Sequence, residues 1–187
     1  MNTVASQIDI SKAIQLGGWM TERELVWLAT AALGCDRIVE FGCFHGRSTR
    51  ALADNCSDKT KIWAVDPWNG DYFTESGENL RTINSFVLPI FRENLKDHIL
   101  SGKVIPVHKF STSFSLPFEV DMVFIDGDHR YETVKKDIHK AMSLVRVGGI
   151  ISGHDYGHPM WTGVKKASDE LLGSVNIEDT IWWIQKS

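Results

Sequence analysis

Two short segments of the chain concentrate acidic and imidazole side chains. They are FIDGDH (124–129), with Asp126, Asp128 and His129, and SGHDYGH (152–158), with His154, Asp155 and His158. Each segment directly follows an apolar, β-branched run typical of a buried strand. In an open α/β sheet ligands bind beyond the carboxyl ends of the strands, so we expect both segments at one rim. Carboxylates and imidazoles held together need a positive charge among them, which predicts a divalent cation such as Mg²⁺ there.

A glycine-containing loop follows an earlier apolar run, over residues 37–41. In IVEFGCFHGRSTRALA (38–53), Glu40 lies on the run, Gly42 follows it, and Gly46 precedes a helical stretch. Glycines let a ligand approach the backbone, and the free N–H groups of the helix face that ligand. The spacing E-x-G-x-x-x-G departs from the G-x-G-x-x-G that binds an anionic pyrophosphate, and the acidic residue suits a cationic ligand.

The next apolar run ends in a second acidic residue, Asp66. An acid at this position can accept hydrogen bonds from both hydroxyls of a ribose. Together with Glu40 and the glycine loop, Asp66 predicts a site for a cationic nucleoside. S-adenosylmethionine, which carries an ammonium and a sulfonium, is such a ligand.

The elements that must position these residues alternate along the chain. The expected strands are residues 37–41, 61–65, 103–107, 121–125 and 148–152, and the expected helices are residues 21–33, 46–55, 79–99, 131–144 and 161–172. The first helix opens with TERE, a capping-box pattern. Repeated strand–helix units make right-handed crossovers and a parallel sheet covered on both faces. The sequence therefore predicts a doubly wound α/β fold.

The end of the chain departs from this alternation. SVNIE (174–178) and TIWWIQK (180–186) are strand-like, and the short turn between them predicts an antiparallel hairpin. Trp182 and Trp183 must point to opposite faces, so both can be buried only if their strand lies inside the sheet. We expect a mostly parallel, seven-stranded, Rossmann-like sheet with this hairpin at its C-terminal end. The irregular stretch 67–77 has the length of a functional lid.

Composition narrows the possible partners. The 187 residues suit a single domain, with an N-terminal helical segment over 1–35 and the core over 36–187. A net charge of -4 gives no general attraction to nucleic acid or anionic membranes. No apolar run reaches membrane-spanning length, and the N-terminus does not read as a signal peptide. Three cysteines without a C-x-x-C pair argue against a disulfide framework, so we expect a cytoplasmic protein.

Four blocks of the sequence resemble one family. VEFGCFHGRST, VDPWNGDY, FIDGDHRYETVKKDI and GGIISGHDY, within residues 37–156, are similar to class I S-adenosylmethionine-dependent methyltransferases. The resemblance is to the small-molecule O-methyltransferase branch that includes macrocin O-methyltransferase-like and cephalosporin-hydroxylase-like proteins. It implies that Gly42 and Gly46 shape the pocket for the methionine part of S-adenosylmethionine and that Ser48 lies near the carboxylate of that methionine. It also implies that Asp66 binds the ribose and that Ser111 borders the adenine.

The same branch resembles the catechol-type O-methyltransferases, which hold a divalent metal with an Asp after strand four and an Asp-Asn pair after strand five. Asp126 and Asp155 match the two Asp positions, whereas Tyr156 replaces the Asn and leaves the third ligand open. His129 matches a lysine that serves as general base in that relative, and an imidazole can take a hydroxyl proton near neutral pH. The resemblance thus implies methyl transfer to a hydroxyl of a small molecule, a sugar or other metabolite, assisted by Mg²⁺. A homodimer is a further implication of the family.

Simpler roles and other functions remain open. Asp128 is expected to cap the helix that begins near Tyr131, and His154 and His158 are compatible with surface positions. An NAD(P)-dependent oxidoreductase shares the architecture, and Tyr131 and Lys135 satisfy its Y-x-x-x-K spacing. The chain lacks G-x-G-x-x-G, and these two residues start a helix behind an acidic loop, an awkward setting for a nicotinamide phosphate, so we interpret the match as accidental. A catalytically silent domain of the same fold is the second alternative.

Overall fold

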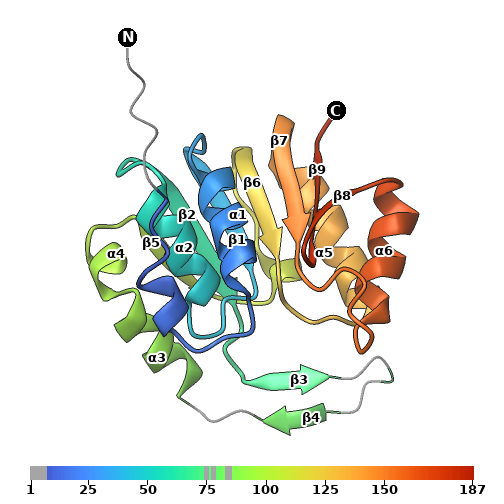
Figure 1. The fold of residues 1–187 in the computed structure, drawn as a ribbon, viewed down its shortest axis with the longest axis horizontal. Helices are drawn as coiled ribbons and strands as arrows, with labels where there is room; N and C mark the ends of the chain where they lie inside the picture. Colours follow the sequence, from blue (N-terminus) through green and yellow to red (C-terminus); the bar gives the residue numbers. More distant parts are fainter. Residues whose placement is uncertain (1–7, 74–75, 77–78, 83–85) are drawn as a thin grey trace.

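A seven-stranded sheet forms the centre of the molecule. The computed structural model describes residues 8–73, 76, 79–82 and 86–187. The sheet order is β5-β2-β1-β6-β7-β9-β8 (Figure 1). Its strands are β1 Arg37–Phe41, β2 Lys61–Asp66, β5 Val104–His108, β6 Val120–Ile125, β7 Val145–Gly153, β8 Asn176–Glu178 and β9 Ile181–Gln185. The first five in sheet order are parallel and β9 is antiparallel to both its neighbours, which confirms the predicted fold class.

Helices cover both faces of this sheet (Figure 1). They are α1 Glu22–Ala32, α2 Arg47–Asn55, α3 Val87–Asn94, α4 Lys96–Leu100, α5 Tyr131–Leu144 and α6 Thr162–Leu172, with short 3-10 turns η1 Ala13–Gln15 and η2 Ser111–Ser113. Leu28 and Leu52 of α1 and α2 share one buried core with Ile38, whereas Ile138 of α5 shares the other with Val39. Because adjacent strand residues point to opposite faces, β1 contributes to both cores and is buried along residues 38–41.

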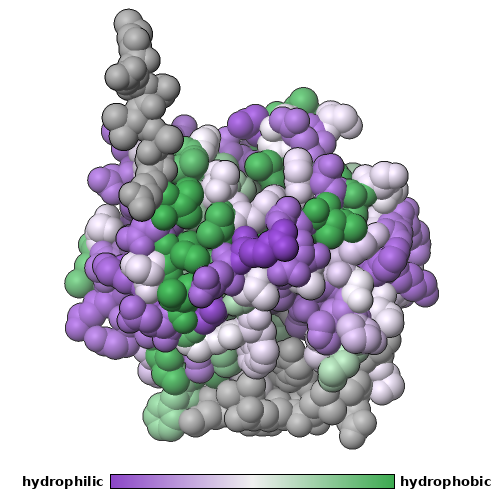
Figure 2. Space-filling model, in the orientation of Figure 1, coloured by the Kyte–Doolittle hydropathy of each residue, from purple (hydrophilic) through white to green (hydrophobic). Residues whose placement is uncertain are grey.

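Helix α1 begins as the TERE pattern predicts. The Glu24 N–H donates to Thr21 Oγ1 at 3.3 Å, and the Thr21 N–H donates to the Glu24 carboxylate at 2.7 Å. The helix buries Leu25 and leaves Val26 exposed. On the face of the molecule seen in Figure 1, hydrophobic residues lie among hydrophilic ones at the surface (Figure 2). None of the helices among the described residues combines the length and apolar character that a bilayer crossing requires.

The C-terminal hairpin is inserted as predicted. Strand β9 lies between β7 and β8, so both of its edges are paired within the sheet. Trp182 is fully buried and packs over Gly153, where an added Cβ would lie under 3.0 Å from its ring. Trp183, on the opposite face, is half-buried. The two tryptophans are packing residues.

The predicted helix over 79–99 is wrong at its start. Residues 79–82 form strand β4, which pairs antiparallel with β3 (Asp71–Phe73) beyond the carboxyl ends of the parallel strands (Figure 1). Helix α3 begins only at Val87, and Pro89 lies in its first turn. A longer helix would place this proline in its interior, where it lacks an N–H and clashes with the preceding turn. The irregular stretch 67–77 is likewise interrupted by β3; its residues 74–75 and 77 lie outside the described residues.

Candidate functional site

A cavity of about 670 Å³ lies at the carboxyl ends of the parallel strands, within the range of small-molecule sites. Its walls are built from the loops that follow successive strands. These loops contribute Gly42 after β1, Asp66 at the end of β2, Ser111 after β5, Asp126 after β6 and Asp155 after β7. Residues predicted from separate parts of the sequence therefore border one space.

Asp66 holds the loop after β1 in place. One carboxylate oxygen accepts from the backbone N–H groups of Cys43 at 2.7 Å and Phe44 at 3.0 Å, and the other accepts from Trp68 at 2.5 Å. Burial raises the pKa of Asp66, while the three backbone donors act in the opposite direction. The loop it fixes contains a left-handed residue, Phe44, with φ 45°. Such a conformation persists only where the surroundings impose it.

Glu40 and Gly46 lie beneath the loop rather than on the cavity wall. Glu40 is fully buried, and its carboxylate accepts from the hydroxyls of Ser48 and Thr49 in the first turn of α2. Burial raises the pKa of Glu40 to about 7, although the two hydroxyls lower it. Gly46 packs against Leu95, and neither Gly46 nor Glu40 is among the residues that line the cavity. Ser48 does line the cavity. Glu40 and Gly46 therefore support the loop, whereas Ser48 forms part of the cavity wall.

At Gly42 the loop passes close to the backbone of Asp126 and Gly127, which follow β6. Its φ is +86°, and an added Cβ would lie under 3.0 Å from the carbonyl oxygen of Asp126. We expect Gly42→Ala to lower the free energy of unfolding by about 2–4 kcal/mol, from backbone strain plus overpacking. Urea denaturation measures this loss.

Gly157→Ala is the matched control for that substitution. Gly157 has a similar φ of +78°, but nothing lies within 4 Å of an added Cβ. It should lose only the conformational part, about 1 kcal/mol. Equal losses for the two variants would show that the close approach to Asp126 carries no energetic weight.

Ser111 has a buried partner that the sequence reading missed. Its hydroxyl donates to the carboxylate of Asp137 on α5, and both residues border the cavity. Burial raises the pKa of Asp137 to about 7, since the hydroxyl of Ser111 only partly offsets it. The signal was present in the helical spacing: Asp137 falls between Val134 and Ala141 on the apolar face of α5.

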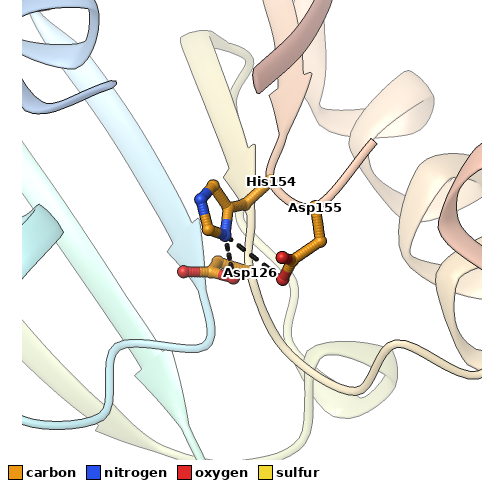
Figure 3. A group of neighbouring side chains, drawn as sticks. All are labelled: Asp126, His154 and Asp155. Atoms are coloured by element: carbon orange, nitrogen blue, oxygen red, sulfur yellow. Dashed lines mark ion pairs between the residues drawn. The ribbon is translucent and has the colours of Figure 1, made fainter. Parts of the chain in front are cut away.

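The two acidic segments converge, as predicted from the order of the strands. β6 and β7 are paired neighbours, with Ile125 opposite Gly153, so the residues that follow them meet. One ring nitrogen of His154, Nδ1, faces both carboxylates, 3.4 Å from Asp126 Oδ1 and 3.2 Å from Asp155 Oδ2 (Figure 3). The candidate ligand atoms of these three residues all lie within 4.8 Å of one another. His154 is only 7% exposed, so the surface position considered for it is wrong.

The electrostatics of this group fit a cation. Burial by itself lowers the pKa of His154, but Asp126, Asp155 and Glu24 outweigh it and raise the pKa far above the ordinary value. Burial raises the pKa of Asp155, but His129 and His154 outweigh burial and hold this pKa well below its usual range. Among the described residues, no backbone N–H or hydroxyl donates to the carboxylate of Asp126 or Asp155; histidines are their partners. Two charged carboxylates and an imidazole are a donor set that divalent ions accept.

The backbone at Asp155 is itself unusual. Its φ is +63°, in the left-handed region that non-glycine residues rarely adopt. This turn directs the carboxylate back toward His154 and Asp126 (Figure 3). Strain of this kind is typical of positions that the function requires.

His129 lies beside the same carboxylates. Its Nε2 is 2.8 Å from Asp155 Oδ2 and 3.8 Å from Asp126 Oδ1, and its ring stacks on Trp161 at 4.8 Å. Burial lowers the pKa of His129, but the two carboxylates raise it to about 9. The ring of His158 lies 6.1 Å from Trp161, and His158 is half-buried at the cavity wall.

Asp128 does not have the capping role predicted for it. The N-cap of α5 is Arg130, which makes no side-chain capping bond. Asp128 instead accepts from the Arg130 backbone N–H at 3.0 Å and pairs with its guanidinium. Because Asp128 lies two residues before the N-cap, its carboxylate closes a local turn rather than reaching the amides of the helix.

Tyr156 and Tyr131 lie outside the ion group. The Tyr156 hydroxyl donates to Asp169 on α6 at 2.7 Å, so Tyr156 does not supply the open third ligand. The Tyr131 hydroxyl is 2.6 Å from Glu170 and 3.2 Å from Lys135. Neither Tyr131 nor Lys135 lines the cavity, which agrees with the interpretation of Y-x-x-x-K as accidental.

Comparisons with known proteins agree with this architecture. The family described as a methyltransferase domain matches residues 39–156. An uncharacterized protein, R132, of Acanthamoeba polyphaga mimivirus is 29% identical over 140 residues. That alignment covers 74% of this chain and 57% of the viral protein, so the chain spans little more than half the length of this relative.

Solved structures share the fold. A SAM-dependent O-methyltransferase of Thermotoga maritima superposes with a TM-score of 0.67 at 14% identity, covering 95% of this chain and 70% of that one. An O-methyltransferase of Bacillus cereus in complex with SAH gives 0.65 at 15% identity, covering 98% and 94%. The family match over residues 39–156, together with the fold shared with these enzymes, places the chain in the class I S-adenosylmethionine-dependent methyltransferases.

Proposed function

We propose that this methyltransferase acts on a hydroxyl of a small molecule, a sugar or other metabolite, with the help of a divalent cation. One observation carries the proposal: the glycine loop and the Asp126–His154–Asp155 group border a single cavity. A methyl donor held at the loop and a hydroxyl held at the ion group would then face each other without intervening protein. Positioning of this kind is a large part of what such enzymes contribute to a two-substrate reaction.

The cofactor half of the cavity is assigned to the loops after β1, β2 and β5. We assign the ribose to Asp66, the methionine end to the loop from Gly42 to Ser48, and the adenine to Ser111. Glu40 and Gly46 support this loop from below. These roles come from the resemblance and from the positions of the residues.

The acceptor half contains the residues for proton removal. A divalent cation held by Asp126 and Asp155 would lower the pKa of an acceptor hydroxyl. His129 Nε2 would take the proton. The hydroxyl oxygen would form a bond to the methyl carbon as the bond from that carbon to sulfur breaks, which would leave a neutral thioether. His129 can accept a proton only when its ring is neutral. The base role therefore requires that the charges of Asp126 and Asp155, which raise its pKa to about 9, be compensated.

Labelled S-adenosylmethionine offered with a panel of sugars, phenols and other hydroxylated metabolites, with and without chelator, tests this proposal. Methyl incorporation into an oxygen that depends on a divalent ion supports it. Incorporation only into nitrogen or carbon contradicts it. Thermal unfolding separates the alternatives, because SAH raises the midpoint of a methyltransferase fold with an intact site, whereas NAD would raise that of an oxidoreductase.

The cofactor assignment makes its own prediction. Asp66→Asn removes a charged acceptor from the cavity wall and should weaken SAH binding by about 1–3 kcal/mol. Calorimetric titration measures this change. Asp58→Asn is the control, since Asp58 is a fully exposed aspartate paired with Lys103 just before β2. Unchanged SAH affinity in a folded Asp66→Asn variant would remove Asp66 from the cofactor site.

A further inference from the structure

The distances around His154 are close to those between ligands of one ion. Donor atoms about 2.1 Å from a common ion and at right angles to each other lie about 3.0 Å apart. His154 Nδ1 is 3.2 Å from Asp155 Oδ2 and 3.4 Å from Asp126 Oδ1. The imidazole therefore occupies the third corner of the group, the position that the sequence left open at Tyr156.

The other ring nitrogen of His154 faces a carboxylate from the N-terminal helix. Nε2 lies 3.2 Å from Glu24 Oε1. Glu24 is 1% exposed and lies on α1, far from both acidic segments in the sequence. A buried carboxylate behind a histidine fixes which nitrogen carries the hydrogen and which presents its lone pair.

Glu24 is itself held by three donors. Its Oε2 accepts from the Thr21 N–H at 2.7 Å, which is half of the capping box of α1. Its Oε1 accepts from the Thr180 hydroxyl at 2.6 Å and the Thr180 N–H at 3.2 Å, in the turn between β8 and β9. The start of α1 and the C-terminal hairpin thus fix one carboxylate directly behind His154.

From this arrangement we infer that Glu24 is a positioning residue that holds His154 as the third protein ligand of the ion site. His154 Nε2 is buried and meets Glu24 Oε1 at 3.2 Å as an ion pair, without hydrogen-bond geometry. With Glu24 on that side of the ring, Nδ1 is the ligand atom between Asp126 and Asp155. The inference rests on the divalent-cation site of the proposed function and adds to it a ligand and its support.

An imidazole in the donor set changes which ion is favoured. Mg²⁺ is a hard ion that prefers oxygen ligands, whereas first-row transition ions bind imidazole nitrogen well. Two carboxylates and one histidine therefore favour an ion such as Mn²⁺ over the Mg²⁺ that the resemblance implies. The preference belongs to His154, because Asp126 and Asp155 are equally suited to both ions.

Metal binding to the chain alone, without cofactor or acceptor, tests this inference. The electron paramagnetic resonance of free Mn²⁺ measures the binding of MnCl₂, and competition with MgCl₂ gives the Mg²⁺ affinity. The wild-type chain should bind Mn²⁺ at least about 10-fold more tightly than Mg²⁺. His154→Asp, which restores an all-oxygen set, should reduce this ratio to less than about threefold. Glu24→Gln should weaken Mn²⁺ binding by about 10–100-fold, the usual effect of losing an outer partner of a ligand.

Two further variants separate positioning from helix stability. Thr21→Ala breaks the other half of the same capping box and should cost about 1 kcal/mol of stability, yet leave the Mn²⁺ affinity within about twofold of wild type. In a His154→Asn background, Glu24→Gln should have little further effect on Mn²⁺ binding, because a residue that acts through His154 is non-additive with it.

Several results would overturn the inference. Wild-type Mn²⁺ affinity in a folded Glu24→Gln variant would leave Glu24 as a helix cap only. Equal affinities for Mn²⁺ and Mg²⁺, or no binding of either, would remove His154 from the ligand set. Failure of the proposed function looks different: Mn²⁺ binding that depends on His154 and Glu24, with no methyl transfer to any hydroxyl, contradicts the O-methyltransferase proposal and leaves the ion site intact.

Discussion

Asp155→Asn, like removal of divalent ions by a chelator, is expected to lower the rate of methyl transfer by at least about 10²-fold while SAH binding stays within about twofold of wild type. The expected separation follows from the geometry, because Asp155 lies at the ion group and the cofactor residues lie on other loops of the cavity. Asparagine keeps the shape of the side chain and tolerates the left-handed backbone found at this position, with φ +63°. The change therefore removes a charge without adding strain.

The rate measured across a metal titration, beside calorimetry with SAH, checks this expectation. Asp126→Asn should behave in the same way as Asp155→Asn, and both should need more metal to approach their maximal rate. Asp169→Asn is the control, since Asp169 pairs with Lys165 on the surface of α6. Full activity of the wild-type chain in excess chelator would contradict the metal role of both aspartates.

The core of the fold could be predicted because its signal is local. A strand buried on both faces is mostly apolar, and the expected strand 37–41 and helix 131–144 coincide with β1 and α5. The prediction of one helix over residues 79–99 was wrong for an equally local reason. The apolar residues of α3 and α4 are spaced as in one helix, which hides the restriction at Pro89 and the short strand β4 before it. A three- or four-residue strand pair contains too few residues to show a period.

The convergence of Asp126 and Asp155 could also be predicted, since parallel neighbouring strands end at one edge of the sheet. The role of Glu40 could not be predicted. Its side chain lies on the same face of β1 as Ile38, under α2, and its hydrogen-bond partners there depend on how α2 packs on the sheet. Its Ser48 and Thr49 partners come from the first turn of that helix.

Glu24 shows a different limit of the sequence. The capping box fully explains a glutamate at position 24, so the sequence does not indicate a second role for it. Only the packing of α1 against the β8–β9 turn brings its carboxylate to His154. Contacts of this kind depend on tertiary structure alone. The same is true of the buried position of His154, which its neighbours in the sequence do not indicate.

The last prediction concerns proton removal at His129. His129→Ala is expected to lower kcat by about 10²–10⁴-fold, the typical contribution of a general base, without changing the metal concentration needed for half-maximal activity. The reason is that Asp126, His154 and Asp155 form the ion group without it, whereas its Nε2 borders the same carboxylates from the Trp161 side. Steady-state rates over a metal titration separate the two quantities.

His158→Ala is the matched control for His129→Ala, because its ring also faces Trp161 at the cavity wall but forms no ion pair with Asp126 or Asp155 among the described residues. It should retain most of its activity. A higher metal requirement in His129→Ala would instead make His129 a ligand, since a lost ligand weakens metal binding and a lost base does not. If His129→Ala turned over as fast as wild type, this rim of the cavity would contain no base among the residues proposed. Deprotonation of the acceptor would then depend on the lowered pKa of the hydroxyl alone, with solvent taking the proton.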